Sequence, residues 1–295
     1  MAVEELKKTL VLGHRNPDTD SICSAICYAG FKHQLTGENY EPCRAGNVNP
    51  ETQYVLDYFK LKAPRLVENV KTQVKDIEIR KTKGVSRGIS LKNAWGLMQE
   101  NNVVTLPCVT EEGLLEGVIT IGDITKSYMN LYDSSIISKA CTKYANILDT
   151  LEGSMVVGDS EAYFDRGKVL IAAANPDLME NYIEKHDLVI LGNRYESQLC
   201  AIEMEAGCII VCEGAGVSLT IRKLAQERGC AVITTPYDTY TTARLINQSM
   251  PISYFMTKEN IIEFSEEDYL DDIREIMASK RHRDFPILDS DGKYI

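Results

Sequence analysis

The sequence lacks long hydrophobic runs, and this absence limits where the protein can act. Its first residues, MAVEELKKTLVLG, contain only a short apolar stretch between charged and polar residues. Such a stretch is too short for the core of a signal peptide or for a membrane span. We therefore expect a cytoplasmic protein that does not associate with membranes.

Basic tracts are absent as well. The 295 residues contain 43 Asp and Glu against 32 Lys and Arg, which gives a formal net charge of -11. Since proteins that bind nucleic acid usually present a basic patch or stripe, this balance argues against a nucleic-acid partner. Hydrophobic residues make up 44% of the chain, enough for a sizeable core divided over two or three domains.

Paired cysteine motifs are also missing. The nine cysteines form an odd set without a Cys-x-x-Cys pair, so we expect reduced thiols. Cys208 and Cys212 lie in the apolar run GCIIVCEG, and Cys23 and Cys27 are one helical turn apart. We interpret these cysteines as small buried apolar residues rather than as metal ligands.

An internal repeat is present in two separated parts of the chain. The stretch from Gly96 to Gly117 can be laid over Glu275 to Ile295 without a gap, at an offset of 179 residues (277 − 98 for the two methionines). Each copy is predicted to contain an extended piece (VKDIEI or YFMTKENIIEF), a helix, a strand after Pro, a glycine turn and another strand. The first copy continues through LLEGVITIGDITKSYMNLY with a strand and a helix. Since the second copy stops at Ile295 and would leave an unpaired strand edge, we expect the chain to be incomplete.

Between the copies, residues 140–248 alternate predicted strands and helices. The segments are GKVLIAAA, MENYIEKH, DLVILG, RYESQLCAIEMEAG, CIIVCEG, SLTIRKLAQERG, AVITT and TYTTARLINQ. This alternation predicts a compact α/β domain with a parallel sheet. No Gly/Ser-rich linker separates it from its neighbours, so close packing of the domains is expected.

The most informative local pattern is GHRNPDTDSICSA, residues 13–25, between a predicted strand (KTLVLG, 8–13) and a predicted helix (21–34). His14, Asp18 and Asp20 then lie at the carboxyl end of a strand, where open α/β sheets bind ligands. Imidazole and carboxylate ligands suit divalent transition metals, which suggests a two-metal hydrolase. The alternative is structural: Asp20 or Ser21 caps the helix, Pro17 sets a turn, and His14 is an ordinary core residue.

The complete string after the strand resembles the first motif of the DHH phosphoesterase superfamily. Together with NVNPETQYVLDYF (47–59), predicted to be helical from Asn49 to Phe59, it is most similar to family II, manganese-dependent inorganic pyrophosphatases. Some members carry two CBS repeats flanking a DRTGG domain. The resemblance implies an α/β chain in which part of a DHH-type parallel-sheet domain precedes α+β CBS repeats around an α/β DRTGG-like domain. The expected segments are 1–66 for the DHH part, 67–129 and 250–295 for the CBS repeats, and 140–248 for the DRTGG-like domain.

The same resemblance implies the chemistry. His14, Asp18 and Asp20 match the first-motif metal ligands, with Mn²⁺ or Co²⁺ as the cofactor and Mg²⁺ as a further candidate. The substrate would be pyrophosphate. The family's later Asp and His-His motifs and its basic substrate motif have no match here. We therefore expect this chain to hold only part of an active site and to be inactive alone.

In the first repeat, Gly117, Thr120 and Asp123 resemble the nucleotide-binding end of a CBS repeat, where AMP, ADP or ATP would act as effector. A phosphate would meet the Thr hydroxyl and the N–H groups at the helix start. The alternative is that Thr120 and Asp123 only cap the helix. The basic segment 281–283 (Arg281, His282, Arg283) could add positive charge. By similarity to CBS proteins we expect a homodimer, with the DRTGG-like domain as a spacer and dimerisation element.

Two other classes of function remain open on the sequence. One is a DHH-type phosphodiesterase acting on oligonucleotides or cyclic dinucleotides. The other is a non-catalytic nucleotide-sensing module. The Asn-x-Glu-Thr stretch and the regulatory arrangement favour the pyrophosphatase over the phosphodiesterase. An incomplete chain without turnover of its own would favour the sensing module.

Overall fold

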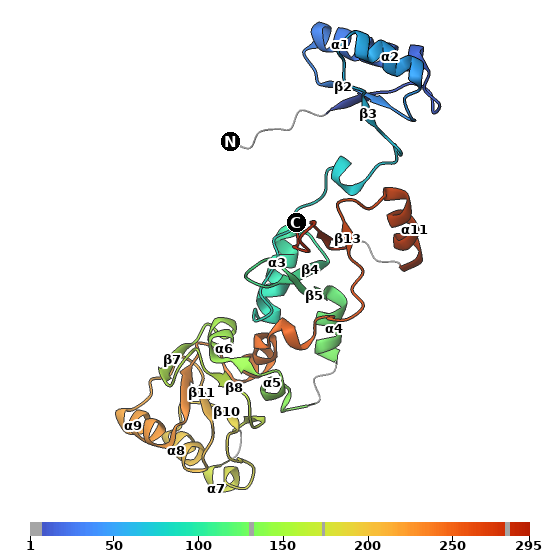
Figure 1. Cartoon of the computed structure of the whole chain (residues 1–295). Coiled ribbons are helices and arrows are strands. Elements are labelled where there is room, and N and C mark those ends of the chain that lie inside the picture. Colours follow the sequence, from blue (N-terminus) through green and yellow to red (C-terminus); the bar gives the residue numbers. More distant parts are fainter. Residues whose placement is uncertain (1–7, 130–132, 173–174, 281–283) are drawn as a thin grey trace. The chain divides into compact units, whose positions relative to one another are not determined.

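A computed structural model of the chain describes residues 8–129, 133–172, 175–280 and 284–295. The chain forms two compact units (Figure 1). The first, here the N-terminal unit, runs up to Gln73 and includes Tyr269–Asp271. The second, here the regulatory unit, comprises Val74–Asp268 and Asp272–Ile295.

The N-terminal unit is a three-stranded parallel sheet with two helices. Its elements are β1 (Thr9–Val11), α1 (Thr19–Thr36), β2 (Tyr40–Arg44), α2 (Pro50–Tyr58) and β3 (Arg65–Leu66), with strand order β1-β2-β3. Asp18 and Asn49 are the N-caps of α1 and α2, and their side chains accept hydrogen bonds from the backbone N–H groups of Ser21 and Thr52. The predicted strand, loop and two helices are confirmed.

The regulatory unit contains both repeats. The elements of the first are η1 (Val74–Asp76), α3 (Leu91–Asn101), β4 (Thr105–Val109), β5 (Leu115–Thr120) and α4 (Ile121–Met129). Those of the second are η3 (Ile252–Tyr254), β13 (Phe264–Ser265), α11 (Leu270–Lys280) and β14 (Ile287–Leu288). β4 and β5 pair antiparallel, whereas β13 and β14 pair in parallel.

The structure confirms the repeat and its offset. Helix α11 has the same length as α3 and starts and ends 179 residues later (270 − 91 and 280 − 101). Gly113 and Gly292 both adopt positive φ, at 88° and 77°, as a tight turn requires. The two copies also meet at equivalent positions, because Leu114 forms an antiparallel bridge with Lys293.

The middle domain lies between the repeats in sequence. Its elements are α5 (Ile136–Lys139), β6 (Thr142–Lys143), α6 (Tyr144–Thr150), β7 (Ser154–Val157), β8 (Tyr163–Phe164), β9 (Val169–Ile171), α7 (Pro176–Met179), β10 (Leu188–Leu191), α8 (Tyr195–Glu203), β11 (Cys208–Val211), α9 (Leu219–Arg228), β12 (Ala231–Thr234), α10 (Thr239–Leu245) and η2 (Ile246–Ser249). The sheet order is β7-β12-β11-β10-β9; β9 to β12 are parallel, and β7 is an antiparallel edge strand.

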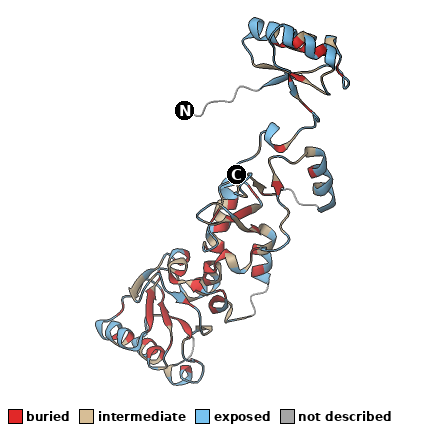
Figure 2. Cartoon of the chain, viewed as in Figure 1, coloured by how far each residue is buried: buried red, intermediate tan, exposed pale blue. Residues whose placement is uncertain are grey.

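Both faces of this sheet are covered, so its central strands are apolar throughout (Figure 2). Leu188 and Ile190 face one core, and Val189 and Leu191 face the other. The first of these cores continues without a break into the first repeat, including Leu91 and other residues of α3 and β5. Close packing of the repeat and the middle domain is therefore confirmed.

Three local predictions are wrong. VKDIEI begins with the 3₁₀ turn η1 and does not form a strand. MENYIEKH is not a helix, because α7 ends at Met179 and the carboxylate of Asp187 instead folds the following loop by accepting the N–H groups of Glu184 and Lys168. Cys208 and Cys212 are buried as expected, but Cys27 is exposed.

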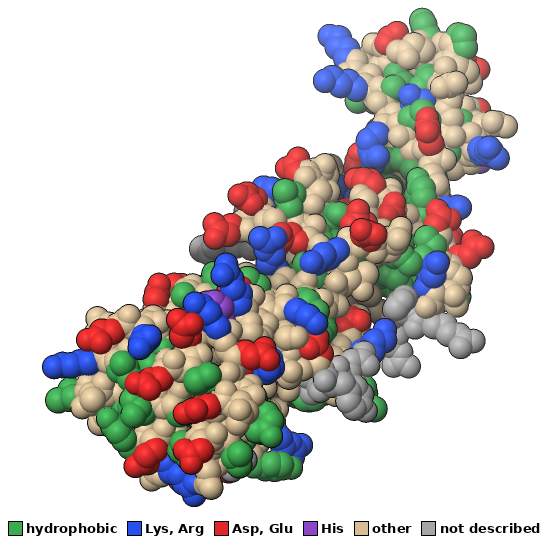
Figure 3. Space-filling model, turned by 90° about the horizontal axis from the view of Figure 1, so that it is seen from below, with side chains coloured by type: hydrophobic (Ala, Val, Ile, Leu, Met, Phe, Trp, Pro, Cys, Tyr) green, Lys and Arg blue, Asp and Glu red, His purple; other side chains and the backbone are tan. Residues whose placement is uncertain are grey.

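Acidic and basic side chains are intermingled on the face displayed in Figure 3. None of the described helices combines the length and apolar character needed to cross a membrane.

Candidate functional site

The N-terminal motif lies where the carboxyl ends of β1 and β2 meet the starts of α1 and α2. A Cβ on Gly13 would lie 2.0 Å from Ser21 Oγ and 3.1 Å from Ser21 Cβ, so a larger residue there would require the Ser21 hydroxyl to rotate away. Gly46, after β2, is more tightly constrained, because an added Cβ would lie 2.6 Å from the backbone oxygen of Arg15. The hydroxyls of Thr19 and Thr52 are 3.0 Å apart and join the two helix starts.

His14 and Asp18 meet at this edge. His14 Nε2 is 3.4 Å from Asp18 Oδ1, and both side chains are more than half exposed. The N–H of Ser21, at 2.9 Å, and the neighbouring imidazole both lower the pKa of Asp18 below its usual range. Asp18 is therefore an ionised carboxylate beside an imidazole near neutral pH.

Asp20 does not join this pair. It lies in the first turn of α1, where its Oδ1 accepts a hydrogen bond from Ser24 Oγ at 3.3 Å. Within the described residues there is no group of three or more His, Cys, Asp and Glu side chains that could hold a metal ion. The residue types suit a divalent transition metal, but the structure assembles only two of the three predicted ligands. It also shows that the helix cap is Asp18 rather than Asp20.

In the first repeat, Thr120 and Asp123 hold each other at the junction of β5 and α4. Asp123 Oδ2 accepts hydrogen bonds from the hydroxyl (2.7 Å) and backbone N–H (3.0 Å) of Thr120, whose Oγ1 accepts the N–H of Asp123. This is the geometry of a capping turn. Gly117 lies against Met256 and Thr257, whose carbonyl oxygen would be 2.8 Å from an added Cβ.

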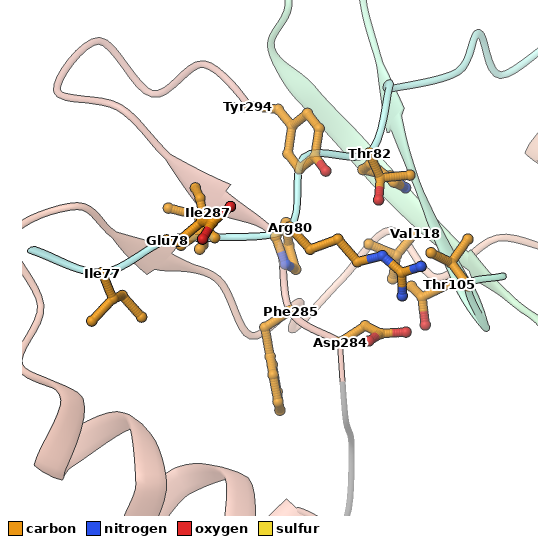
Figure 4. A pocket seen from close by; sticks show the side chains of 14 residues that line it. Ile77, Glu78, Arg80, Thr82, Thr105, Val118, Asp284, Phe285, Ile287 and Tyr294 are labelled. Atoms are coloured by element: carbon orange, nitrogen blue, oxygen red, sulfur yellow. The ribbon is translucent and has the colours of Figure 1, made fainter. Parts of the chain in front are cut away.

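A cavity of about 260 Å³ lies between the two repeats (Figure 4). Its lining combines residues of the segment 77–82, the hairpin β4-β5, and the second repeat around β14. They are Ile77, Glu78, Ile79, Arg80, Thr82, Val103, Thr105, Pro107, Val118, Asp284, Phe285, Pro286, Ile287 and Tyr294. An adjoining cavity of about 160 Å³ shares Thr105 and Phe285 with it and reaches Thr120. The combined volume of the two cavities falls in the lower part of the range of about 300–1,000 Å³ that is typical of small-molecule binding sites.

The two adjoining cavities are here called the double cavity, and Thr120 is part of its lining. Arg80, which lines the larger of the two cavities, was not identified from the sequence. A signal was available, because Arg80 opens the basic stretch RKTKG directly after VKDIEI. Burial raises the pKa of Tyr294, so its hydroxyl at the cavity stays protonated. The segment 281–283, to which positive charge was assigned, lies outside the described residues.

Family models and a solved structure match the regulatory unit. The DRTGG domain model matches residues 146–249, and the CBS domain model matches residues 74–130 and 252–295. A solved structure of the CBS and DRTGG domains of the regulatory region of Clostridium perfringens pyrophosphatase, complexed with the activator diadenosine tetraphosphate, has a TM-score of 0.72 and 34% identity. The match covers 76% of this chain and 98% of that chain.

The chain belongs to the family of inorganic pyrophosphatases with CBS and DRTGG domains. In this family it is 38% identical over 285 residues to the cobalt-dependent inorganic pyrophosphatase of Clostridium perfringens, covering 97% of this chain and 52% of that protein. It is 29% identical over 292 residues to the probable manganese-dependent inorganic pyrophosphatase of Thermotoga maritima, covering 99% and 53%. The chain therefore spans about half the length of these curated pyrophosphatases.

Proposed function

We propose that the whole protein hydrolyses inorganic pyrophosphate with Mn²⁺ or Co²⁺, and that an adenine nucleotide regulates the reaction at the CBS repeats. The observation that carries the proposal is the 38% identity to a cobalt-dependent pyrophosphatase, which extends over 97% of this chain. Mg²⁺ is a further candidate metal. The proposal includes a cytoplasmic homodimer, to be tested by cell fractionation and by light scattering of the purified protein.

His14, Asp18 and Asp20 are the residues that would hold metal ions. When bound, these ions lower the pKa of a water molecule and neutralise charge on the phosphoanhydride. Asp18 contributes a carboxylate that is already ionised, and its Oδ1 also accepts the N–H of Ser21 at the helix start. We propose that these three residues are only part of the metal site, since the described residues bring together no group of three or more potential ligands.

At the repeats, the double cavity would receive the nucleotide. Its apolar lining, including Val118 and Phe285, suits an adenine ring, while Thr120 and Asp284 offer polar groups for the ribose hydroxyls. Asp123 adjoins the cavities through its hydrogen bonds to Thr120. The related regulatory region from C. perfringens was solved with diadenosine tetraphosphate as activator. Calorimetry with AMP, ADP and ATP tests this part, and no binding at millimolar ligand would refute it.

The metal part is tested by direct binding measurements rather than by activity alone. Calorimetric titration of the full-length protein with Co²⁺ would compare wild type with His14→Ala, Asp18→Asn and Asp20→Asn. Each substitution is expected to weaken Co²⁺ binding by more than about 10-fold, since even residues that only orient ligands contribute this much.

His33→Ala is the matched control, because His33 lies on the same helix and hydrogen-bonds only a backbone oxygen, that of Glu38. It should leave the Co²⁺ affinity unchanged. Wild-type affinity in all three motif variants would refute the ligand assignment.

A further inference from the structure

Arg80 occupies a defined position at the cavity between the repeats. Its Nη2 donates a hydrogen bond to the backbone oxygen of Asn101 at 2.8 Å, and its Nη1 donates one to that of Asn102 at 3.2 Å. Asn101 ends α3, and Asn102 is its C-cap in the left-handed conformation, with φ 50°. Because the last carbonyl groups carry the negative end of the helix dipole, they hold the guanidinium group in place.

These two bonds leave most of the guanidinium free to bind something else. Arginine has five N–H donors, of which two are used here. Arg80 is in none of the ion pairs found among the described residues, although Glu78 and Asp284 line the same cavity. Arg80 is also the single cation among the described residues that line the larger cavity.

The lining around Arg80 combines apolar side chains with the two carboxylates of Glu78 and Asp284. Figure 4 shows the Arg80 side chain extending towards Thr105 and Val118, with Asp284 and Phe285 below it. Ile77, Ile287 and Phe285 supply apolar surface from the other side. The arrangement can take a ligand with a flat apolar part and one anionic group.

We propose that Arg80 is the residue that selects phosphorylated over neutral adenine ligands in this cavity. This inference rests on the proposed nucleotide function and deepens it. The remaining N–H donors of Arg80 bind a phosphate group, while the carbonyl groups of Asn101 and Asn102 keep the guanidinium in its binding orientation. Glu78 and Asp284 line the same cavity and are anionic, so Arg80 is the group among the described lining residues that can attract a phosphate.

Calorimetry on this chain with AMP and with adenosine tests the proposal. Arg80→Gln should weaken AMP binding by at least about 10-fold, because charge-assisted hydrogen bonds are the strong class, and should change adenosine binding by less than about 2-fold. Arg80→Lys should fall between wild type and Arg80→Gln, because lysine keeps the charge but not the planar fork. Lys83→Gln makes the same change in charge at an exposed position three residues away, outside the cavity lining, and should bind AMP like wild type.

The outcomes separate this inference from the function on which it rests. If wild type binds neither ligand, the nucleotide function fails and Arg80 has no such role. If wild type binds AMP and Arg80→Gln binds it equally well, or loses AMP and adenosine affinity in equal proportion, only the Arg80 inference is wrong.

Loss of the helix contacts could destabilise the variants, so a measurement on wild type alone is included. Added salt should reduce the ratio of AMP to adenosine affinity, since it screens the pairing of Arg80 with phosphate. A ratio independent of salt would overturn the proposal.

Discussion

The N-terminal unit and the middle domain solve the problem of burying apolar surface in different ways. In the middle domain, all residues of β10 and β11 are completely buried. In the N-terminal unit, Tyr28, Phe31 and Leu35 of α1 are 53%, 60% and 68% exposed, and α2 likewise exposes Tyr54 and Tyr58. The middle domain is stabilised by its own core, whereas the N-terminal unit carries the proposed metal ligands on a thin layer with much exposed apolar surface.

The motif depends on close packing around its loop more than on a large core. Gly13 against Ser21 and Gly46 against Arg15 fix the loop that carries His14 and Asp18. The stability of the middle domain should therefore depend mainly on its core volume. The stability of the N-terminal unit should depend mainly on these glycines.

The largest effect is expected from a buried leucine of the middle domain. Leu188→Ala should lower the free energy of unfolding by about 3 kcal/mol, since it removes fully buried methyl groups and leaves a cavity. The same substitution at exposed Leu35 should change it by less than about 0.5 kcal/mol. Urea denaturation of both variants measures this, and equal losses would erase the difference between the regions.

A smaller effect is expected at the motif. Gly46→Ala should cost about 1–3 kcal/mol, because its Cβ would overlap the backbone oxygen of Arg15 and force the loop away. Gly30→Ala, in the same unit, has open space around its Cβ and should stabilise α1 by up to about 1 kcal/mol. Thermal denaturation followed by circular dichroism measures both changes, and a Gly46→Ala variant as stable as Gly30→Ala would contradict the importance of this close contact.

The smallest effect is expected for the rise in pH from 8 to 10. Burial raises the pKa of Cys108 and of Cys230 to about 12, whereas an unfolded thiol ionises near pH 9. The unfolded state then loses protons first, so stability is complete below pH 9 and falls as the pH rises from 9 towards 12, by at most about 1.4 kcal/mol per thiol and pH unit.

Urea titrations at pH 8, 9 and 10 test the alkaline effect. Cys230→Ala should flatten the pH dependence, whereas Cys27→Ser, at an exposed thiol, should not. If the free energy of unfolding of Cys230→Ala falls with pH as steeply as that of wild type, the burial of the Cys230 thiol does not cause the pH dependence.

Much of the fold could be predicted because short segments of the sequence carry clear patterns of secondary structure. The apolar runs DLVILG and CIIVCEG can only be buried strands in an α/β alternation, and the offset between Met98 and Met277 predicted two equivalent helices. Failures occurred where tertiary contacts override the pattern. MENYIEKH has helical composition, but the carboxylate of Asp187 binds two backbone N–H groups and folds a loop instead.

The site was less predictable for the same reason. The motif indicated three candidate ligands, but only the folded geometry shows that Asp18 caps α1 beside His14 while Asp20 turns to Ser24. Arg80 was missed because its position depends on the end of α3, more than twenty residues away. The spacing of residues along the chain indicates which side-chain types are present. It does not show which of these side chains contact one another in the folded protein.

The most direct test of the central claim is hydrolysis of pyrophosphate by the full-length protein. The account predicts phosphate release that requires Mn²⁺ or Co²⁺, changes in rate when an adenine nucleotide is added, and falls to background in Asp18→Asn. Hydrolysis of oligonucleotides or cyclic dinucleotides without hydrolysis of pyrophosphate, or pyrophosphate hydrolysis that persists in Asp18→Asn, would contradict it.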